Sequence, residues 1–201
     1  IDTICQMSCN PAMGGVAKGQ IVREIDALGG YSGIVTDRTM IQFRMLNRSK
    51  GPAMWSPRAQ SDKFQFSLEW RYILENLTNV SLWQDEVNEL IVENNKAVGV
   101  KTKTGISIYS SSIVLTNGTF LNGVIHIGET SFQGGRIGEE SVRGLTENLQ
   151  NLGFDTARLK TGTPVRVNGN TIDFSVLEEQ KGDESPAKFS YLNTPKLIDQ
   201  R

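Results

Sequence analysis

The residues best suited to chemistry lie in the first twenty positions, where a thiol precedes a glycine-rich loop. After Cys9 come, in order, Asn10, Pro11, Gly14, Gly15, Lys18 and Gly19. Backbone N–H groups of such a loop can approach an anion when a helix follows, because the helix dipole favours negative charge there. A cysteine beside the loop can have its thiolate stabilised. The loop therefore predicts either a reactive thiol beside an anion-binding turn, or a flexible turn with a buried cysteine.

Three helices are predicted around and beyond this loop. The first covers residues 19–28, where apolar side chains recur at helical spacing until Gly29-Gly30 ends the pattern. The second begins at Ser56-Pro57, which combines an N-cap residue with proline at the first helical position, and runs to residue 77. Apolar residues occupy much of its circumference, so we expect it to be largely buried. The third helix is expected over residues 140–152.

Short strands are predicted in two groups. The first group covers residues 33–36 and 40–46. The second is a meander over residues 80–83, 87–92, 97–102 and 106–109, with turns at Asn94-Asn95 and Thr104-Gly105. A continuous apolar run at 113–116 then predicts a buried parallel strand that ends in the tight turn Asn117-Gly118-Thr119. Ligands of open α/β sheets bind beyond the carboxyl ends of such strands, so this turn is a candidate binding site.

Composition and charge narrow the class of protein. The 201-residue chain has 38% hydrophobic residues, 21% charged residues and a net charge of -1. No apolar run is long enough to span a bilayer, so nothing requires a membrane. The near-neutral charge does not by itself predict nucleic-acid binding, although a local basic patch could support it. The two cysteines, Cys5 and Cys9, form no disulfide framework and suggest a reducing compartment, and a single histidine, His126, excludes a histidine-rich metal site.

Several separate motifs, in order along the chain, closely resemble one family of flavin-dependent enzymes. They include Met7-Ser8-Cys9-Asn10-Pro11, Asp26–Gly30, Ile41–Arg44, Ser49–Ala53, Gly118–Leu121, His126–Gly128, Gly134–Arg136 and Arg158–Pro164. The family is MnmG, also called GidA, the large subunit of an enzyme that modifies the wobble uridine of tRNA. The resemblance covers essentially the whole chain.

The resemblance implies an α/β fold: a partial FAD-binding domain of the two-dinucleotide-binding flavoprotein type, Rossmann-like, with a β-meander. Residues 1–160 would form this domain, and residues 161–201 would begin an inserted α/β domain. No G-x-G-x-x-G fingerprint is present, although a complete dinucleotide-binding domain opens with one. We therefore expect a fragment of a longer protein, whose first strand, fingerprint and carboxy-terminal helical domain lie outside this sequence.

For the intact protein, the resemblance implies tRNA modification. With the GTPase MnmE, it would add an aminomethyl or carboxymethylaminomethyl group to C5 of the wobble uridine. The implied cofactors are FAD, NADH and methylene-tetrahydrofolate, and the implied assembly is a cytoplasmic homodimer. Two alternatives remain open: a relative of the folate- and FAD-dependent tRNA uracil-5-methyltransferase, and a binding fragment without chemistry of its own.

The resemblance also assigns roles to particular residues. Cys9 matches a cysteine thought to act in catalysis, where a thiolate could add to C6 of uracil and make C5 nucleophilic, or could protect a flavin-bound carbon unit. Cys5 lies outside the motif and is expected to pack in the interior. The positions implied to contact FAD are Gly14, Gly15, Lys18, Gly19, Val87, Thr116, Gly118, Thr119 and Val142.

Basic residues in the same motifs are candidates for binding phosphates, either of the flavin cofactor or of tRNA. Those assigned to tRNA are Arg44, Arg48, Lys50, Arg136, Arg158 and Lys160, and Arg58 is of the same kind. Arg48 and Lys50 precede the Gly51-Pro52 turn, which predicts a stiff basic loop. Surface solvation is the simpler alternative for any one of these residues.

Overall fold

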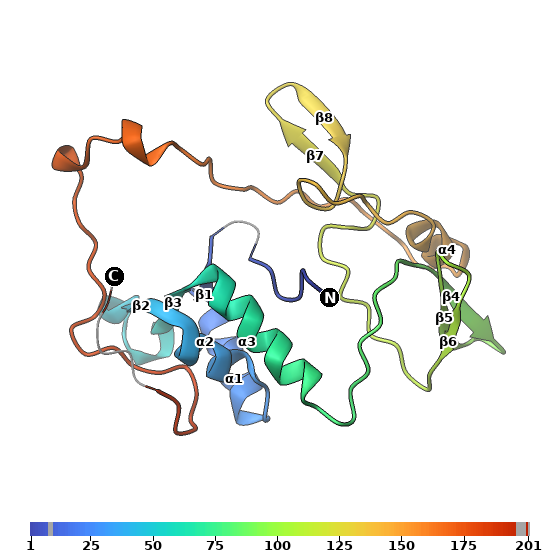
Figure 1. Ribbon diagram of the computed structural model, residues 1–201, viewed down its shortest axis with the longest axis horizontal. Helices are drawn as coiled ribbons and strands as arrows, with labels where there is room; N and C mark the ends of the chain where they lie inside the picture. The colour runs from blue at the N-terminus through green and yellow to red at the C-terminus, as the bar shows by residue number, and fades with distance from the viewer. Residues whose placement is uncertain (8–9, 196–199, 201) are drawn as a thin grey trace. The chain divides into compact units, whose positions relative to one another are not determined.

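The computed structural model describes residues 1–7, 10–195 and 200, which divide into two compact units. The first unit combines Ile1–Leu82 with Gly162–Arg201, and the second covers Trp83–Thr161 (Figure 1). None of the helices in the described ranges combines the length and apolar character that a membrane crossing needs. The domain division expected from the sequence, at residue 160, follows the order of the chain and stays a prediction.

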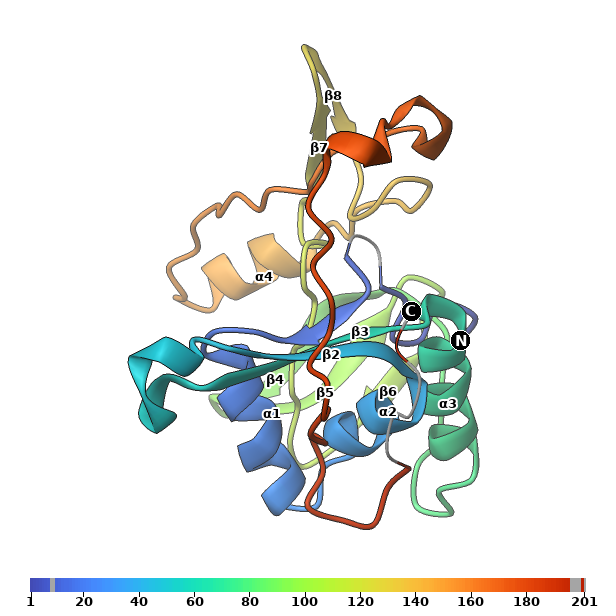
Figure 2. The same cartoon turned by 90° about the vertical axis from the view of Figure 1, so that its left-hand side faces the viewer.

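The first unit contains a three-stranded antiparallel sheet with β3 (Ser56–Ser61) between β1 (Ala12–Gly14) and β2 (Met40–Leu46) (Figure 2). The predicted strand at 40–46 is confirmed. The helix predicted to start at Ser56-Pro57 is wrong at its beginning, because residues 56–61 pair with strands on both sides. Ladder hydrogen bonds on two edges outweigh a local helix-start signal.

Helix α3 (Lys63–Glu75) begins seven residues after the predicted start, at a different cap. The Asp62 carboxylate accepts hydrogen bonds from the backbone N–H groups of Phe64 and Gln65, both at 3.0 Å, and so provides the N-cap. One face of α3 is buried through Phe66 and Ile73, whereas the other remains open. The expectation of a largely buried helix is therefore wrong: Phe64, Leu68 and Tyr72 are 75%, 57% and 65% exposed.

Two further helices precede α3 in the chain. Helix α1 (Lys18–Ala27) confirms the predicted helix after the glycine-rich loop. Helix α2 (Ser32–Thr39) occupies the place of a predicted strand at 33–36, so that prediction is wrong. The β-branched residues there favour a strand locally, but Val35 and Thr36 are fully buried in the helix, and Val35 packs with Phe66 and Ile73. Tertiary packing overrides the local preference.

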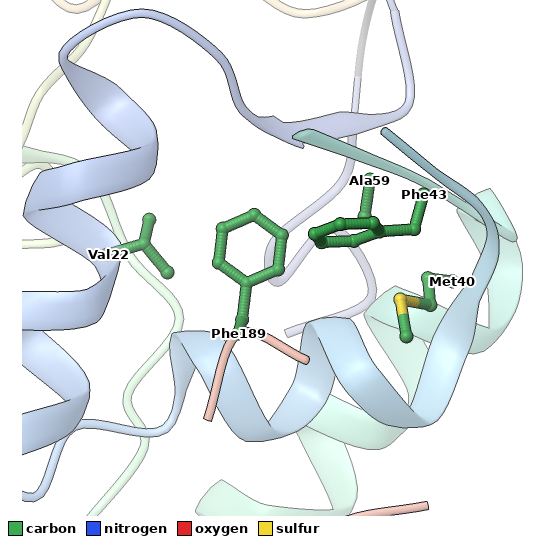
Figure 3. Close-up of a cluster of buried hydrophobic side chains, with 5 residues drawn as sticks. All are labelled: Val22, Met40, Phe43, Ala59 and Phe189. Atoms are coloured by element: carbon green, nitrogen blue, oxygen red, sulfur yellow. The ribbon is translucent and has the colours of Figure 1, made fainter. Parts of the chain in front are cut away.

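The core of the first unit joins its two distant chain segments. Phe189, from the last thirty residues, inserts between Val22 and Phe43, and its ring meets that of Phe43 edge to face at 6.0 Å (Figure 3). Met40 and Ala59 complete the cluster. Burial of an aromatic ring of this size is a major source of stability, so residues near 189 belong to the folded core.

The side chains of Asp26 and Asp37 are buried and bind the backbone of residues 189–191. We call these two carboxylates the carboxylate clasp. Asp37 accepts from the N–H groups of Phe189 at 2.7 Å and Ser190 at 3.0 Å, and from the Thr194 hydroxyl at 2.6 Å. Asp26 accepts from the N–H of Tyr191 at 2.8 Å. Hydrogen bonds to ionised acceptors are stronger than neutral ones, so the clasp fixes the path of the chain at 189–194.

The second unit opens with a meander of three antiparallel strands, β4 (Val87–Glu93), β5 (Lys96–Thr102) and β6 (Ser107–Tyr109). The predicted strands at 87–92, 97–102 and 106–109 are confirmed within one or two residues. Asn94 and Asn95 both have positive φ, 49° and 61°, as a tight two-residue hairpin turn demands. Alternating polarity and turn residues therefore specify this meander locally.

Other predictions for the second unit need correction. Residues 80–83 and 113–116 form no strand; Val114 is 84% exposed, and no described strand pairs with 113–116. A parallel strand needs partners for its N–H and C=O groups, and apolar composition alone does not supply them. Residues 124–133, where no strand is predicted, hold a hairpin, β7 (Val124–Ile127) with β8 (Thr130–Gln133).

The last elements are short. Helix α4 (Leu145–Asn151) confirms the end of the predicted helix at 140–152, but it begins five residues later, where the Glu147 side chain accepts from the Gly144 N–H at 3.0 Å. Among the described residues beyond 161, the structure has two single 3₁₀ turns, at Gly169–Thr171 and Phe174–Val176.

Candidate functional site

The glycine-rich loop makes a tight connection from β1 to α1. The N–H of Gly15 donates to the carbonyl of Pro57 at 2.9 Å, and the N–H of Gly19 donates to the carbonyl of Gly15 at 2.8 Å. A Cβ added at Gly14 or Gly19 would lie 2.1 or 2.5 Å from the Pro57 carbonyl oxygen. Both glycines are thus required by close backbone approach, and their predicted contact with a cofactor stays a prediction.

Ala17 carries an unusual backbone conformation at the start of α1. Its φ of 64° and ψ of -51° match a γ-turn, which the N–H of Lys18 closes by donating to the carbonyl of Val16 at 2.9 Å. The Lys18 ammonium group donates to the carbonyl of Ala12 at 3.3 Å, which ties the loop back to β1. The loop N–H groups of Gly15, Lys18 and Gly19 are all engaged inside the protein, so these three do not form a phosphate cradle.

Of the two thiols, the predicted nucleophile Cys9 lies outside the described residues, and its role stays a prediction. Cys5 is exposed and lies in a turn with φ of 50°, so the expectation that it packs in the interior is wrong. Partial desolvation by nearby residues raises the pKa of the Cys5 thiol above its ordinary value. A raised pKa disfavours the thiolate, so Cys5 has no sign of an activated nucleophile.

In the second unit, Val87 lies at the first position of β4, half-buried. One edge of β4 faces α4, where the Leu90 N–H donates to the Asn148 side chain at 3.1 Å. Next to Val87, the amide oxygen Oδ1 of Asn88 is buried and has no hydrogen-bond partner in the described part of the chain. A buried acceptor without a partner suits a donor supplied by a ligand.

The turn over residues 117–123 is docked against residues 134–142, and we call it the docked turn. The Val142 N–H donates to the Phe120 carbonyl, and the Asn122 N–H donates to the Val142 carbonyl, both at 2.9 Å. The Thr119 hydroxyl donates to the carbonyl of Gly135 at 2.8 Å. The structure therefore brings Thr119 close to Val142, two residues assigned to the cofactor from separate motifs.

Two of the arginines assigned to tRNA meet the docked turn as well. The Arg136 guanidinium lies over the Phe120 ring at 5.4 Å and pairs with the Glu139 carboxylate at 2.9 Å. Arg158 donates to the carbonyl of Asn122 at 3.1 Å. Their hydrogen bonds and stacking fix the turn in place, so neither guanidinium is a purely solvated surface charge.

Asn122 connects the docked turn to α4. Its side-chain amide donates to a Glu147 carboxylate oxygen at 2.8 Å, and this bond is the largest cause that lowers the pKa of Glu147 below its ordinary value. Asn122 also has a φ of 48°, in the left-handed region that asparagine tolerates better than most residues. Sequence reasoning missed this residue, although Asn before Gly is a turn signal that could have found it.

The remaining basic candidates lie apart from the docked turn in the sequence. Arg48, in a 3₁₀ turn at Arg48–Lys50, pairs with the Asp183 carboxylate at 2.7 Å, and Asp183 also accepts from the Met45 N–H. Lys50 and Lys160 are exposed. Arg44 on β2 donates to the Gln180 side chain at 2.9 Å. The predicted basic loop thus has one of its charges neutralised, which sequence spacing could not show.

The described residues fit part of a dinucleotide. Gly118 has a φ of 55°, and an added Cβ there would meet nothing within 4 Å, so the docked turn leaves its backbone open to a ligand. The unpaired Asn88 oxygen beside Val87 offers a second contact. The engaged N–H groups of the loop at 14–19 do not fit a pyrophosphate. Among the described residues, no group of three or more His, Cys, Asp or Glu could hold a metal ion.

Comparison with known proteins identifies the fold and the family. All of the chain, residues 1–201, matches the family described as glucose inhibited division protein A, GIDA. The structure is similar to that of GidA from Aquifex aeolicus, with a TM-score of 0.92 and 49% sequence identity. The superposed region covers 100% of this chain and 34% of the Aquifex chain. This likeness confirms the expected α/β fold class of a partial, Rossmann-like FAD-binding domain.

The sequence relatives agree. The chain is 64% identical to the tRNA uridine 5-carboxymethylaminomethyl modification enzyme MnmG of Cytophaga hutchinsonii, and 60% identical to that of Flavobacterium johnsoniae. Both alignments cover 100% of this chain and 32% of the relative, so the chain spans about a third of the length of these enzymes. With the family match over every residue, the chain belongs to the GidA family.

Proposed function

We propose that the protein carrying this chain is an FAD-dependent enzyme that modifies C5 of the wobble uridine of tRNA, adding an aminomethyl or carboxymethylaminomethyl group. The observation that carries the proposal is the docked turn: residues of separate family motifs, Thr119, Arg136, Val142 and Arg158, converge on one turn with an open backbone at Gly118. The names of the relatives at 64% and 60% identity support the substrate.

FAD, reduced by NADH, supplies reducing equivalents when bound, and methylene-tetrahydrofolate supplies the one-carbon unit. Val87, with the Asn88 amide oxygen, would contact the adenine side of the cofactor, and Thr116, Gly118, Thr119 and Val142 would contact the flavin side. Gly14, Gly15, Lys18 and Gly19 would shape the loop near Cys9 rather than hold a phosphate through the engaged N–H groups.

Cys9 would act on the uracil ring. Its thiolate forms a bond to C6, and the electron pair of the C5=C6 double bond moves to C5, which becomes nucleophilic. C5 then bonds to the incoming carbon as the bond from that carbon to its carrier breaks and the carrier keeps the electron pair. The C5 proton leaves to water, and its electron pair re-forms the double bond and expels the thiolate. The thiol is unchanged at the end of the cycle. Arg44, Arg48, Lys50, Arg136, Arg158 and Lys160 are proposed to position tRNA through its phosphates.

The test uses the full-length protein and two substitutions, Cys9→Ser and Cys5→Ala. Modified nucleosides of digested tRNA are measured by mass spectrometry, and FAD by absorbance. We expect Cys9→Ser to abolish modification at unchanged FAD content, and Cys5→Ala to have little effect, since the Cys5 thiol is not activated. Equal activity of Cys9→Ser and the natural protein would contradict the catalytic role.

The same digest separates the alternatives. A uracil-5-methyltransferase would produce 5-methyluridine, and the proposed enzyme would produce a nitrogen-containing group on the wobble uridine. A protein that only binds would leave the tRNA unchanged and would show no flavin absorbance. The MnmE GTPase, a homodimeric assembly and a cytoplasmic location belong to the same proposal, and co-purification with size-exclusion chromatography would test the first two.

A further inference from the structure

The polar face of the first sheet holds two arginines side by side. Strands β2 and β3 lie side by side (Figure 2). In their antiparallel register, Arg44 on β2 lies directly opposite Arg58 on β3, and Gln42 lies opposite Gln60 two residues along. Directly opposite residues share a face of the sheet. The adjacent pair, Phe43 and Ala59, is fully buried on the other face.

The hydrogen bonding of β2 fixes how close the arginines lie. The Phe43 N–H donates to the Gln200 side chain, outside the sheet, at 2.8 Å, and the Phe43 carbonyl accepts from the Asp183 N–H at 2.8 Å. Because Phe43 points its backbone groups outward, Arg44 points its own toward β3. Arg44 and Arg58 therefore form a hydrogen-bonded pair, for which the Cα spacing is about 5.5 Å.

In the described part of the chain, no acidic side chain compensates the charge of these two arginines. Among the residues that the structure describes, no carboxylate forms an ion pair with Arg44 or Arg58. Arg44 is oriented by a neutral group, the Gln180 side chain, at 2.9 Å. Arg48, only four residues away, does have a carboxylate partner, Asp183. Like charges directly opposite each other in a sheet are destabilising, so the arrangement lacks a reason within the fold itself.

The side chains beside the two arginines are small on one side. Both arginines are half-buried, and the buried Phe43–Ala59 pair prevents the strands from turning them away. Across β1, the neighbours of Gln60 and Arg58 are Ala12 and Gly14, which carry no large side chain. The two guanidinium groups and the Gln60 amide offer several N–H donors on one face, the arrangement that recognises a phosphate. The Gln42 amide donates to the Gln180 carbonyl at 3.3 Å.

We propose that Arg44 and Arg58, flanked by Gln42 and Gln60, form a phosphate-binding site on the sheet of the first unit. The phosphate comes from the backbone of an RNA or from a nucleotide, and the two sources share the same chemistry. The RNA source rests on the proposed function, since it places tRNA against this face. The nucleotide source does not depend on tRNA.

The test measures binding of a fluorescently labelled RNA stem-loop to the full-length protein across salt concentrations, with Arg44→Gln/Arg58→Gln as the variant. Losing two phosphate contacts lowers the slope of log affinity against log salt by about 1.5 to 2. We expect at least a tenfold loss of affinity at low salt. The control Lys63→Gln/Arg71→Gln removes the same charge from α3, and we expect it to leave the slope unchanged. Circular dichroism establishes that each variant is folded.

A second arm separates the two sources. Inorganic pyrophosphate and ADP are titrated against the natural protein and the variant in a thermal-shift assay. Competition of either with the RNA, or stabilisation that the variant loses, would identify a nucleotide as the source. Loss of RNA affinity without any response to the small anions would identify the RNA backbone.

Two outcomes of these measurements distinguish the absence of the phosphate site from a failure of the proposed function. If the natural protein binds RNA and Arg44→Gln/Arg58→Gln binds it with the same slope and the same response to pyrophosphate, the site does not exist, whereas tRNA binding stands. If RNA does not bind the natural protein but pyrophosphate stabilises it in an arginine-dependent way, the phosphate site stands and the proposed function fails.

Discussion

The two units of the chain are stabilised by contacts of different range. In the first unit, Asp37 and Phe189 meet across 152 positions of sequence, and Asp26 and Tyr191 across 165. In the second unit, β4 and β5 are joined by a two-residue turn. Of the hydrophobic side chains described in that unit, only Leu145 is fully buried. Distant burial and charge-assisted hydrogen bonds thus stabilise one unit, whereas local backbone pairing stabilises the other.

The largest expected effect is the loss of the Phe189 ring. Because the side chain is 1% exposed and packs against Phe43, Phe189→Ala should lower the free energy of unfolding of the first unit by about 3 to 5 kcal/mol. Urea denaturation, with hydrogen exchange assigning the loss to each unit, measures this. Phe174→Ala removes the same ring from a 69% exposed position and should change stability by less than about 0.5 kcal/mol. Equal effects of the two would contradict the long-range account.

Next in size is the carboxylate clasp. Asp37→Asn puts an amide where three donors converge, so about 2 to 3 kcal/mol should be lost. Asp26 offers a matched comparison, since its Oδ2 accepts from Tyr191 while its buried Oδ1 has no hydrogen-bond partner among the described residues. In Asp26→Asn, the amide oxygen can still accept from the Tyr191 N–H, and the NH₂ group takes the place of Oδ1. This substitution should therefore lower the free energy of unfolding by less than Asp37→Asn does. A larger loss for Asp26→Asn than for Asp37→Asn would overturn this ranking.

A smaller effect is expected in the local unit. Asn94 has a φ of 49°, a conformation that costs an ordinary side chain about 1 to 2 kcal/mol. Asn94→Ala should therefore raise hydrogen exchange in β4 and β5 modestly, and Asn94→Gly should restore protection. Exchange in α1 and β2 should not change in either variant. If the first unit responded as strongly as the meander, the division into local and long-range stabilisation would be wrong.

The smallest effect concerns pH. The hydrogen bond from Asn122 lowers the pKa of Glu147 in the folded protein, so this link contributes stability above the ordinary carboxyl range. The contribution is lost as the pH falls through the lowered folded pKa. We expect the protection factors of the Asn122 side-chain amide and the Gly144 N–H, each taken relative to an unstructured peptide at the same pH, to fall at acid pH in the natural protein and to be independent of pH in Glu147→Gln. Identical pH profiles would remove Glu147 from the network.

Range also decides what the sequence could predict. The meander and α1 follow from patterns within about ten residues, namely alternating polarity, turn residues and helical spacing. The predictions for residues 33–36 and 56–61 are wrong because partners outside such a window decide the structure there. Helix α2 is buried beside α3, and β3 pairs on both edges. The insertion of Phe189 gives no local signal at all.

The candidate site shows the same contrast. The Asn117-Gly118-Thr119 turn is predicted from its own residues, although the strand expected before it does not form. Its docking onto Val142 and the contact from Arg158 depend on backbone pairing between separate segments. The neutralisation of Arg48 by Asp183 is equally invisible in the sequence, since 135 positions separate them.

The placement of Phe189 has a consequence for synthesis on the ribosome. The amino-terminal helices and strands emerge first, but their core and both clasp carboxylates lack their partners until residues near 194 have left the exit tunnel. The meander, encoded between the two halves, has all its strands available much earlier. In nascent chains arrested before residue 189, the meander should therefore be folded while the amino-terminal helices and strands still lack their core. The order of folding then differs from the order of translation.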